Sequence, residues 1–255
     1  MCTVTFIPSK DGVVFTSNRD EHISRGIALY PEIYKSNGHK LIYPRDSKAG
    51  GSWFVSNEKG DTGILLNGAF EKHSPQPPYR KSRGLMLLDL FDTGSPYEII
   101  RNYNFKGIEN FTLILWQGGV LREIKWDGLR LKERKHNSGL PHIWSSVTLY
   151  TEKMIHERHL WFRNWILSNN KISPLDILSF HNHTQNDNKE YGLRISRDSK
   201  ISTTSITSLC LENQQAIYRH LDIVQDIETI LEYDLQQVQH LTTTSTDTDE
   251  LAQKN

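Results

Sequence analysis

A thiol stands at the second position of the chain, directly after the initiator methionine. A small residue in this place is the usual context for methionine removal, which would leave Cys2 first with a free α-amine. Such an amine titrates near pH ~8, so a sizeable fraction of it is an uncharged base at neutral pH. Cys2 would then carry a nucleophile and its base on one residue. We therefore predict that the Cys2 thiolate attacks an amide or thioester carbonyl.

The plainer interpretation of Cys2 is structural, because free cysteine often packs as a small hydrophobic residue. The other cysteine is Cys210, and two cysteines make neither a disulfide framework nor a metal-binding spacing. The two interpretations differ in one observable way: a catalytic Cys2 has to face a cavity.

The charged tetrapeptide Asn18-Arg19-Asp20-Glu21 supplies the groups that would serve Cys2. Asp20 could accept a hydrogen bond from the α-amine and orient it. Arg19 could lower the pKa of the thiol or clamp a substrate carboxylate. Asn18 is a substrate-binding candidate, with the shaping of a turn as its alternative. For Arg19 and Asp20 the alternative is a salt bridge that caps a turn.

Four further residues are candidates for the rest of a site. The side-chain amide of Asn67, at the end of an expected strand, is our candidate donor to an oxyanion. Gly51 and Trp53 follow a tight glycine turn and could line a ligand pocket, although a loop-to-strand turn is the plainer explanation of the glycines. Arg83, ahead of an expected helix, is either an anion clamp for a substrate or a solvated surface residue.

Histidine is the other residue type that could do chemistry. His156 and His159 share a helix face and could bind a metal or haem, but no third ligand is evident. We therefore expect no metal site and no required cofactor, and interpret the pair as surface residues.

An opening hairpin has to position these groups. Residues 3–7 and 13–17 alternate with β-branched side chains and are separated by a proline- and glycine-containing turn, so each is a predicted strand. The hairpin would bring the tetrapeptide, expected as a turn after the second strand, back beside Cys2.

The rest of the chain mixes strands and helices. Apolar runs and glycine turns predict further strands, and serine-proline starts and helical periodicity predict helices. Expected strands cover residues 27–30, 41–43, 53–56, 62–67, 111–116, 120–126, 129–134, 201–211 and 216–220. Expected helices cover residues 84–91, 95–102, 151–169, 173–181 and 221–238. Residues 1–241 are expected to form a single domain, followed by a disordered tail over 242–255.

Composition excludes several function classes. Lysine plus arginine and aspartate plus glutamate each number 30, so no overall field attracts nucleic acid or anionic membrane. The N-terminus lacks the features of a signal peptide, and no apolar run reaches the ~18 residues of a membrane span. We expect a cytoplasmic protein whose partner is a small molecule.

The ordered set of motifs resembles the NRDE family, also called the transport and Golgi organisation family, whose name repeats the tetrapeptide. The matching segments are Met1-Cys2, Asn18-Arg19-Asp20-Glu21, Gly50-Gly51-Ser52-Trp53-Phe54, Leu66-Asn67, Ser82-Arg83-Gly84-Leu85, Ser145-Ser146 and Leu149-Tyr150-Thr151. The resemblance implies an α+β fold like that of N-terminal nucleophile (Ntn) hydrolases, a four-layer αββα sandwich of antiparallel sheets.

Two functions follow from this resemblance. The first is an Ntn-type amidohydrolase or acyltransferase with Cys2 as nucleophile, acting on a non-peptide carbon–nitrogen or thioester bond. The second is a non-catalytic protein that binds or traffics haem or acyl lipid on the same scaffold, since the family has been connected with haem mobilisation and acyl-lipid metabolism. Haem would then be a ligand rather than a cofactor.

Overall fold

The computed structural model describes residues 2–198 and 200–236, where the chain forms two antiparallel sheets of seven strands each. The strand order is β10-β1-β2-β12-β13-β14 in the first sheet, with β11 paired to β12, and β3 to β9 in chain order in the second. The strands of the first sheet are β1 Cys2–Pro8, β2 Gly12–His22, β10 His142–Ser145, β11 Ser196–Arg197, β12 Ile201–Glu212, β13 Gln215–Asp222 and β14 Ile227–Asp234. Those of the second are β3 Ala28–Ser36, β4 His39–Asp46, β5 Phe54–Asn57, β6 Thr62–Asn67, β7 Phe111–Gln117, β8 Val120–Trp126 and β9 Leu131–His136.

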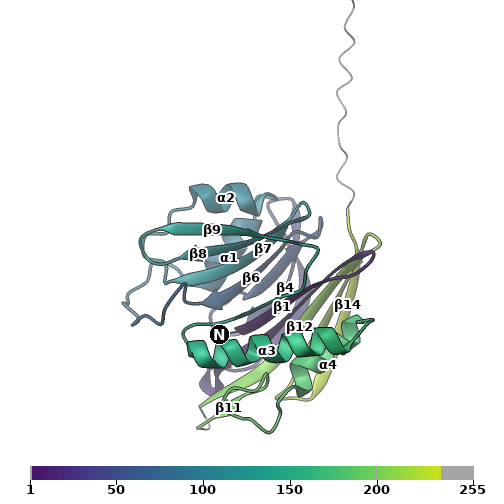
Figure 1. Cartoon of the computed structure of the whole chain (residues 1–255). Coiled ribbons are helices and arrows are strands. Elements are labelled where there is room, and N and C mark those ends of the chain that lie inside the picture. The colour runs from purple at the N-terminus through teal and green to yellow at the C-terminus, as the bar shows by residue number, and fades with distance from the viewer. Residues whose placement is uncertain (1, 199, 237–255) are drawn as a thin grey trace, which may run out of the picture.

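Alternation along the strands divides the apolar side chains between three interfaces. In β1, Val4 and Phe6 lie in the core between the two sheets, whereas Ile7 packs toward helices on the outer face. A third core lies between the second sheet and its own helices. Three apolar interfaces separate four layers, seen from top to bottom in Figure 1 as helices, sheet, sheet and helices. The predicted αββα sandwich of antiparallel sheets is confirmed.

Helices α1 Arg83–Phe91 and α2 Pro96–Asn102 cover the second sheet, and α3 Glu152–Ser168 and α4 Pro174–His183 cover the first. The sequence signals for helix starts mostly hold. The α4 helix begins with a capping box, in which Ser173 and Asp176 each bind the other's backbone N–H. The predicted capping role of Ser95 is wrong, because its side chain makes no capping hydrogen bond to α2.

The tetrapeptide at 18–21 is not a turn, contrary to the prediction. Strand β2 continues through it to His22, and a 3-10 turn, Ile23–Arg25, follows. The reason lies in pairing: β12 pairs with the whole segment, and β1 pairs with Asn18 and Arg19 on its other edge. Its backbone groups therefore find partners in the sheet, which charged side chains on either face do not prevent.

The helix predicted over 221–238 is also wrong. Residues 221–234 are the end of β13, a turn at Asp226 with positive φ, and strand β14, and residues 237–238 lie outside the described part of the chain. In β14 the partly buried side chains Thr229, Leu231 and Tyr233 alternate with exposed ones, which is the period of a strand. The spacing of the apolar residues also fits a helix. The pairing of β14 with β13 is what makes the segment a strand.

Two features escaped the sequence analysis. Strand β10 was not predicted, although it pairs with β1 and forms an edge of the first sheet. His181, expected at the start of a polar loop, lies inside α4 and is fully buried. Both depend on contacts with β1, which precedes them in the chain by more than a hundred residues.

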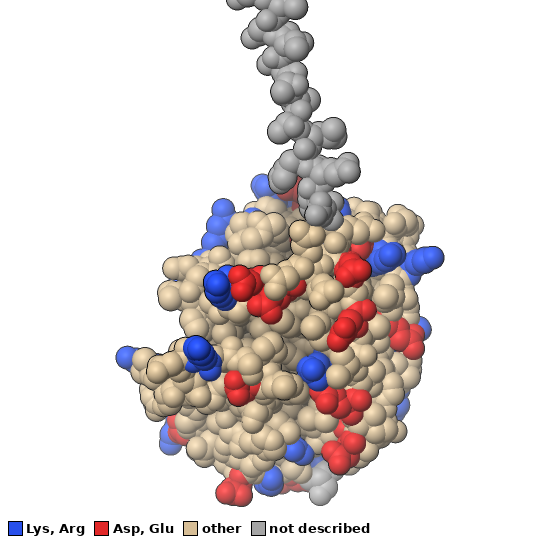
Figure 2. All heavy atoms as spheres, turned by 90° about the vertical axis from the view of Figure 1, so that its right-hand side faces the viewer, with Lys and Arg blue, Asp and Glu red and all other residues tan. Residues whose placement is uncertain are grey.

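Basic and acidic side chains both occur across the face shown in Figure 2, in keeping with the balanced composition. Within residues 2–198 and 200–236, no helix combines the length and apolar character needed to cross a membrane. The predicted tail over 242–255 lies outside the described residues, and the single-domain prediction for 1–241 extends beyond them and stays a prediction.

Candidate functional site

The register of the opening hairpin determines which residues lie beside Cys2. Strands β1 and β2 pair with Cys2 opposite Arg19 and Thr3 opposite Asn18. The prediction that the hairpin returns the tetrapeptide to the second residue therefore holds for the backbone. Opposed residues of an antiparallel pair belong to the same face of a sheet. Position 2 thus shares the face of Arg19, which is also the face of Val4 in the core between the sheets.

Strand geometry divides the tetrapeptide between two faces. Arg19 and Glu21 line a cavity at the end of the space between the sheets. Asn18 and Asp20 lie on the opposite face, under α3 and α4, and are fully buried. Sequence analysis grouped these residues as one cluster because they are adjacent in the chain, but successive side chains of a strand point to opposite faces.

Arg19 is held firmly in the cavity wall. Its guanidinium donates to Asp46 Oδ2 at 2.8 Å and to Thr204 Oγ1 at 3.0 Å, and it lies 4.8 Å from the centre of the Trp53 ring. Burial opposes ionisation of Asp46, but the backbone N–H of Ala49 and the charges of Arg25 and Arg19 hold its pKa below the usual value. Arg19 is therefore a fixed positive charge beside position 2.

Asp20 is buried among donors on the helix side. Tyr150 Oη donates to Asp20 Oδ2 at 2.6 Å, and Thr203 Oγ1 donates to Oδ1 at 2.7 Å. Burial raises the pKa of Asp20, while the nearby charge of Arg158 acts in the opposite direction. Arg158 is itself fully buried, donates to Thr3 Oγ1, and lies 3.5 Å from the centre of the Tyr150 ring.

Asn18 links the strand to α4 through His181. Asn18 Nδ2 donates to the carbonyl of Leu193 at 2.7 Å, and its Oδ1 meets His181 Nδ1. Burial lowers the pKa of His181 to about 3, so the ring is neutral. Because Asn18 Oδ1 only accepts, the proton of the ring is on Nδ1, and Nε2 accepts from Thr5 Oγ1 at 2.8 Å. The apolar spacing Ile177, Phe180, His181 in α4 was the one sequence signal for this burial.

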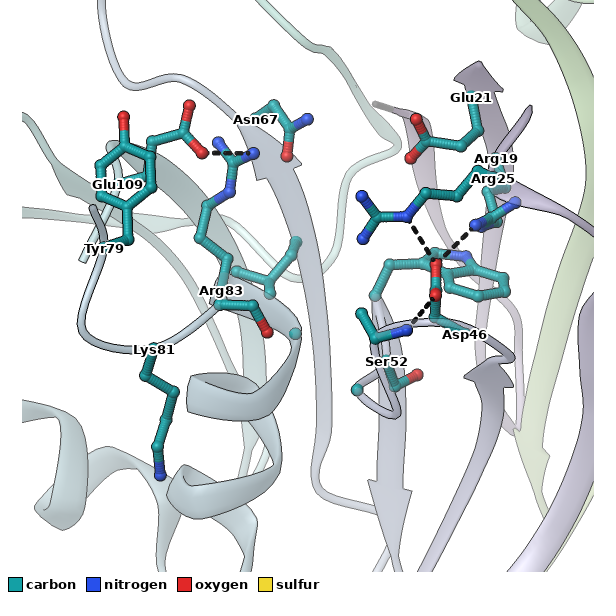
Figure 3. A pocket seen from close by; sticks show the side chains of 16 residues that line it. Arg19, Glu21, Arg25, Asp46, Ser52, Asn67, Tyr79, Lys81, Arg83 and Glu109 are labelled. Carbon is teal, nitrogen blue, oxygen red and sulfur yellow. Dashed lines mark hydrogen bonds and ion pairs between the residues drawn. The ribbon is translucent and has the colours of Figure 1, made fainter. Parts of the chain in front are cut away.

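The cavity measures about 500 Å³ and brings together most of the predicted site residues. It is lined by Arg19, Glu21, Arg25, Asp46, Ala49, Gly51, Ser52, Trp53, Leu65, Asn67, Tyr79, Lys81, Ser82, Arg83, Gly84 and Glu109. Figure 3 shows two charged walls, with Arg19, Arg25 and Asp46 on one and Arg83 and Glu109 on the other. Arginine and carboxylate side chains from β2, β4, α1 and the connecting loops converge here, so the cavity suits a polar or charged group.

Arg83, at the start of α1, forms the second wall. Its guanidinium pairs with Glu109 Oε2 at 2.9 Å and donates to the carbonyl of Asn110 at 3.0 Å. Glu109 also binds His73 Nε2 at 3.2 Å. Arg83 is therefore not a solvated surface residue: it lines the cavity with its guanidinium held by a carboxylate.

Asn67 ends strand β6 between the two walls (Figure 3). Its backbone carbonyl accepts from Ser146 Oγ at 2.7 Å, which fixes the strand end. Its side-chain amide makes no hydrogen bond with any residue that the structure describes. The Nδ2 group is thus available to a ligand.

Gly51 allows a close backbone contact between the cavity loop and α1. A Cβ at Gly51 would lie 2.5 Å from the carbonyl carbon of Gly84 and 2.6 Å from the nitrogen of Leu85. Ser52 N donates to the carbonyl of Gly84 at 3.3 Å, closing this contact. Gly51 therefore lines the cavity, as one of the two sequence interpretations had it, and its contact with α1 joins the two walls.

Behind Arg19 lies a group of buried polar atoms that the sequence did not reveal. Ser17 Oγ, Ser205 Oγ, Trp53 Nε1 and His220 Nε2 have no hydrogen-bond partner among the described residues. In the first sheet, Ser205 of β12 lies opposite Arg19 of β2. Thr207 of β12 lies opposite Ser17 of β2 on one side and opposite His220 of β13 on the other, so His220 shares the face of Ser17. Burial lowers the pKa of His220 to about 4. Buried polar atoms of this kind are usually satisfied by ordered water.

Histidine, cysteine, aspartate and glutamate form no cluster of three suited to a metal ion in the described part of the chain. His156 and His159 lie on the exposed side of α3, in a second cavity away from Arg19.

Comparisons with known proteins agree with this architecture. A family model described as Transport and Golgi organisation 2 matches residues 1–240. A comparison with curated protein sequences found no match. Among solved structures, a mutant of conjugated bile acid hydrolase from Clostridium perfringens has a TM-score of 0.56 at 13% identity, covering 94% of this chain and 100% of that one. An N-acylethanolamine-hydrolyzing acid amidase orthologue from Caenorhabditis elegans has a TM-score of 0.57 at 9% identity, covering 82% and 92%. At these identities the similarity shows a shared fold.

Proposed function

Since the chain belongs to the Transport and Golgi organisation 2 family and has an Ntn-hydrolase-like fold, we propose that it is a cysteine amidohydrolase or acyltransferase. The bond that it cleaves in its substrate is a non-peptide carbon–nitrogen or thioester bond. The nucleophile is Cys2 after removal of Met1. One observation carries the proposal: Cys2 pairs with Arg19, which lines a charged cavity. The two similar structures are of a conjugated bile acid hydrolase and an N-acylethanolamine-hydrolyzing acid amidase, and this similarity supports a hydrolytic function.

In the proposed reaction the α-amine of Cys2 takes the thiol proton as sulfur attacks the carbonyl carbon. The tetrahedral intermediate collapses, the carbon–nitrogen or carbon–sulfur bond breaks, and the leaving group takes that proton. Water or an acceptor then attacks the thioester, giving its proton to the amine, and the Cys2 sulfur leaves. General acid–base assistance of this kind contributes about 10²–10⁴-fold.

The neighbouring residues have separate proposed roles. Arg19 favours the thiolate as a fixed positive charge. The free Nδ2 of Asn67 donates to the oxyanion. Asp20, held by Tyr150 and Thr203 next to the Cys2–Arg19 pair, orients the α-amine and the strand that carries it.

In this proposal the walls of the cavity bind the substrate. Trp53 and Gly51 shape the wall around Arg19, and Arg83 with its partner Glu109 faces them. Asn18 supports the site from the other face of β2 by tying the strand to α4. The proposal places the protein in the cytoplasm, where a thiol stays reduced, and cell fractionation tests that part separately.

Limited alkylation with iodoacetamide tests the nucleophile. Intact mass should show a chain without Met1, and peptide mapping should find the first adduct on Cys2. Cys210 is the internal control, because burial raises the pKa of its thiol to about 11. Retention of Met1 in active protein, first labelling of Cys210, or hydrolysis of amide and thioester substrates by Cys2→Ala would each overturn the proposal.

A second function is non-catalytic binding and trafficking of haem or acyl lipid. What favours it is that Asn18, Arg19 and Asp20 are all held by buried partners, as in a structural framework. Under this alternative Cys2 is an axial thiolate or part of the pocket wall. Haemin titration of the wild type and of Cys2→Ala, followed by absorbance, separates the roles. A saturable spectral change that is lost in Cys2→Ala supports thiolate ligation, and the absence of such a change contradicts it.

A further inference from the structure

A second cavity, of about 700 Å³, lies where the two sheets fail to cover each other. Strand β10 is an edge of the first sheet, and β9 is an edge of the second. The inner faces of β8 and β9 extend beyond the β10 edge, and α3 closes the space from the other side. This cavity shares no lining residue with the cavity at Arg19. Its size is typical of a small-molecule site.

One wall is an apolar stripe on α3. The lining positions recur at intervals of three and four, so one side of the helix faces the cavity. They are Ile155, His156, His159, Leu160, Phe162, Arg163, Ile166 and Leu167. Leu160 is 41% exposed and Leu167 71% exposed. The opposite side of α3 already packs on the protein, through Arg158 and through Trp161 stacked on Tyr191. Phe162 and Ile166, along one edge of the stripe, pack into the core against the first sheet, whereas Leu160 and Leu167 remain exposed to the cavity.

The floor is β10 with its aromatic side chains. The rings of Trp144 and His142 stack with centroids 5.5 Å apart. Ser145 Oγ is buried and has no hydrogen-bond partner among residues 2–198 and 200–236. The floor thus combines flat aromatic rings with one polar atom that has no partner among the described residues.

Two exposed arginines line the cavity, and one of them, Arg134, lies opposite Glu123 in the register of β8 and β9. Arg134 in β9 and Arg163 in α3 make no ion pair with any described residue, and they approach the cavity from opposite walls. The single lining carboxylate, Glu123, is bound by Lys125 at 2.9 Å and by His136 at 2.9 Å. An apolar cavity with two unpaired arginines complements an anion that carries an apolar body.

We propose that this cavity binds a soluble anionic amphiphile, with its apolar body along α3 and Trp144 and its carboxylate, sulfonate or phosphate head between Arg134 and Arg163. The site requires no chemistry at Cys2. Its occupation and the catalytic proposal are separable, and Cys2→Ala should bind the amphiphile as the wild type does.

Isothermal titration with dodecanoate below its micellar concentration tests this site on the full-length protein. We expect saturable binding at one site. Arg134→Glu with Arg163→Glu should weaken it by about tenfold or more, since a loss of about 1.4 kcal/mol is tenfold. Arg101→Glu with Arg130→Glu, an equal change of charge at two exposed positions outside the cavity, should leave affinity unchanged.

The apolar wall has its own matched pair of variants. Leu160→Glu places a carboxylate on the stripe and should abolish binding, whereas Leu175→Glu, at an exposed leucine of α4, should not. Circular dichroism confirms that each variant is folded. Equal affinity for dodecyltrimethylammonium, binding to phosphatidylglycerol vesicles but not to dodecanoate, or affinity that no cavity variant alters would overturn the proposal.

Discussion

Arg19 and Asp20 are neighbours in β2, yet their side chains serve opposite faces of the first sheet. Arg19 donates to Asp46 at 2.8 Å in the cavity between the sheets, and Asp20 accepts from Tyr150 at 2.6 Å under α3. The two charges are therefore compensated by different partners rather than by each other. The backbone of residue 2 pairs with Arg19, so the Arg19 guanidinium lies on one face of the sheet at this point. On the other face lies the buried carboxylate of Asp20 with its hydrogen-bond donors.

Removal of the Arg19 charge should destabilise the protein and slow alkylation of Cys2. Arg19→Leu leaves Asp46 with only the more exposed Arg25, and breaking a buried pair of this kind costs about 2 kcal/mol or more. Arg25→Leu should cost less than about 1 kcal/mol, because the Arg25 side chain is 44% exposed. Urea unfolding of both variants checks the order. If Arg19→Leu and Arg25→Leu lowered the free energy of unfolding equally, the Arg19–Asp46 ion pair would not be the stronger of the two ion pairs of Asp46.

A methyl group at Gly51 should separate the cavity loop from α1. In Gly51→Ala the new Cβ meets backbone atoms at 2.5 Å and 2.6 Å, which cannot move without the helix. Overpacking of this kind costs about 1–3 kcal/mol. Gly139→Ala is the control, since its nearest contact is the side chain of Asn137 at 3.3 Å. Thermal unfolding that ranks the two variants in the reverse order would contradict the close contact.

Buried neutral histidine should make the protein less stable in mild acid. Burial lowers the pKa of His181 to about 3, whereas the unfolded chain takes up the proton near 6.5. The free energy of unfolding should therefore fall as pH drops below about 6.5, by up to about 1.4 kcal/mol per pH unit for this group. His220, with its pKa lowered to about 4, adds to the same trend. Asp20 opposes it, because its raised pKa favours protonation in the folded state.

His181→Gln isolates the contribution of this ring. Its unfolding free energy should change less steeply between about pH 6.5 and pH 4.5 than that of the wild type. His183→Gln, two residues further along α4 and exposed, should keep the wild-type slope. Urea unfolding at a series of pH values measures the slopes, and identical slopes for wild type and His181→Gln would rule out the buried neutral ring.

Asn67 should affect the rate of acyl transfer more than the stability. Its amide has no partner among the described residues, so Asn67→Ala should change the free energy of unfolding by less than about 1 kcal/mol. If Asn67 Nδ2 stabilises the oxyanion, kcat with an amide or thioester substrate should fall by about 10²–10³-fold. Unchanged kcat in a variant that lacks the amide would remove Asn67 from the proposed mechanism.

Some of these features were predictable because they depend on neighbouring residues. The turn after residue 7 and the alternation on either side of it predicted the opening hairpin, and the register confirms that it returns to position 2. Serine-proline pairs predicted the starts of α2 and α4 for the same reason. The resemblance to a family supplied the layered architecture, which the local patterns did not.

The sequence by itself determined which strands form the opening hairpin and which residues are candidates for a site, since turn geometry and side-chain alternation act over a few residues. Only the tertiary structure decided which face each side chain serves. The pairing of β2 with β12 turned an expected turn into strand and directed Asn18 toward His181, 163 positions away. It likewise made a strand of residues 227–234, whose apolar spacing suited a helix. Such choices follow from backbone partners and burial that arise between distant segments, and no local pattern encodes them.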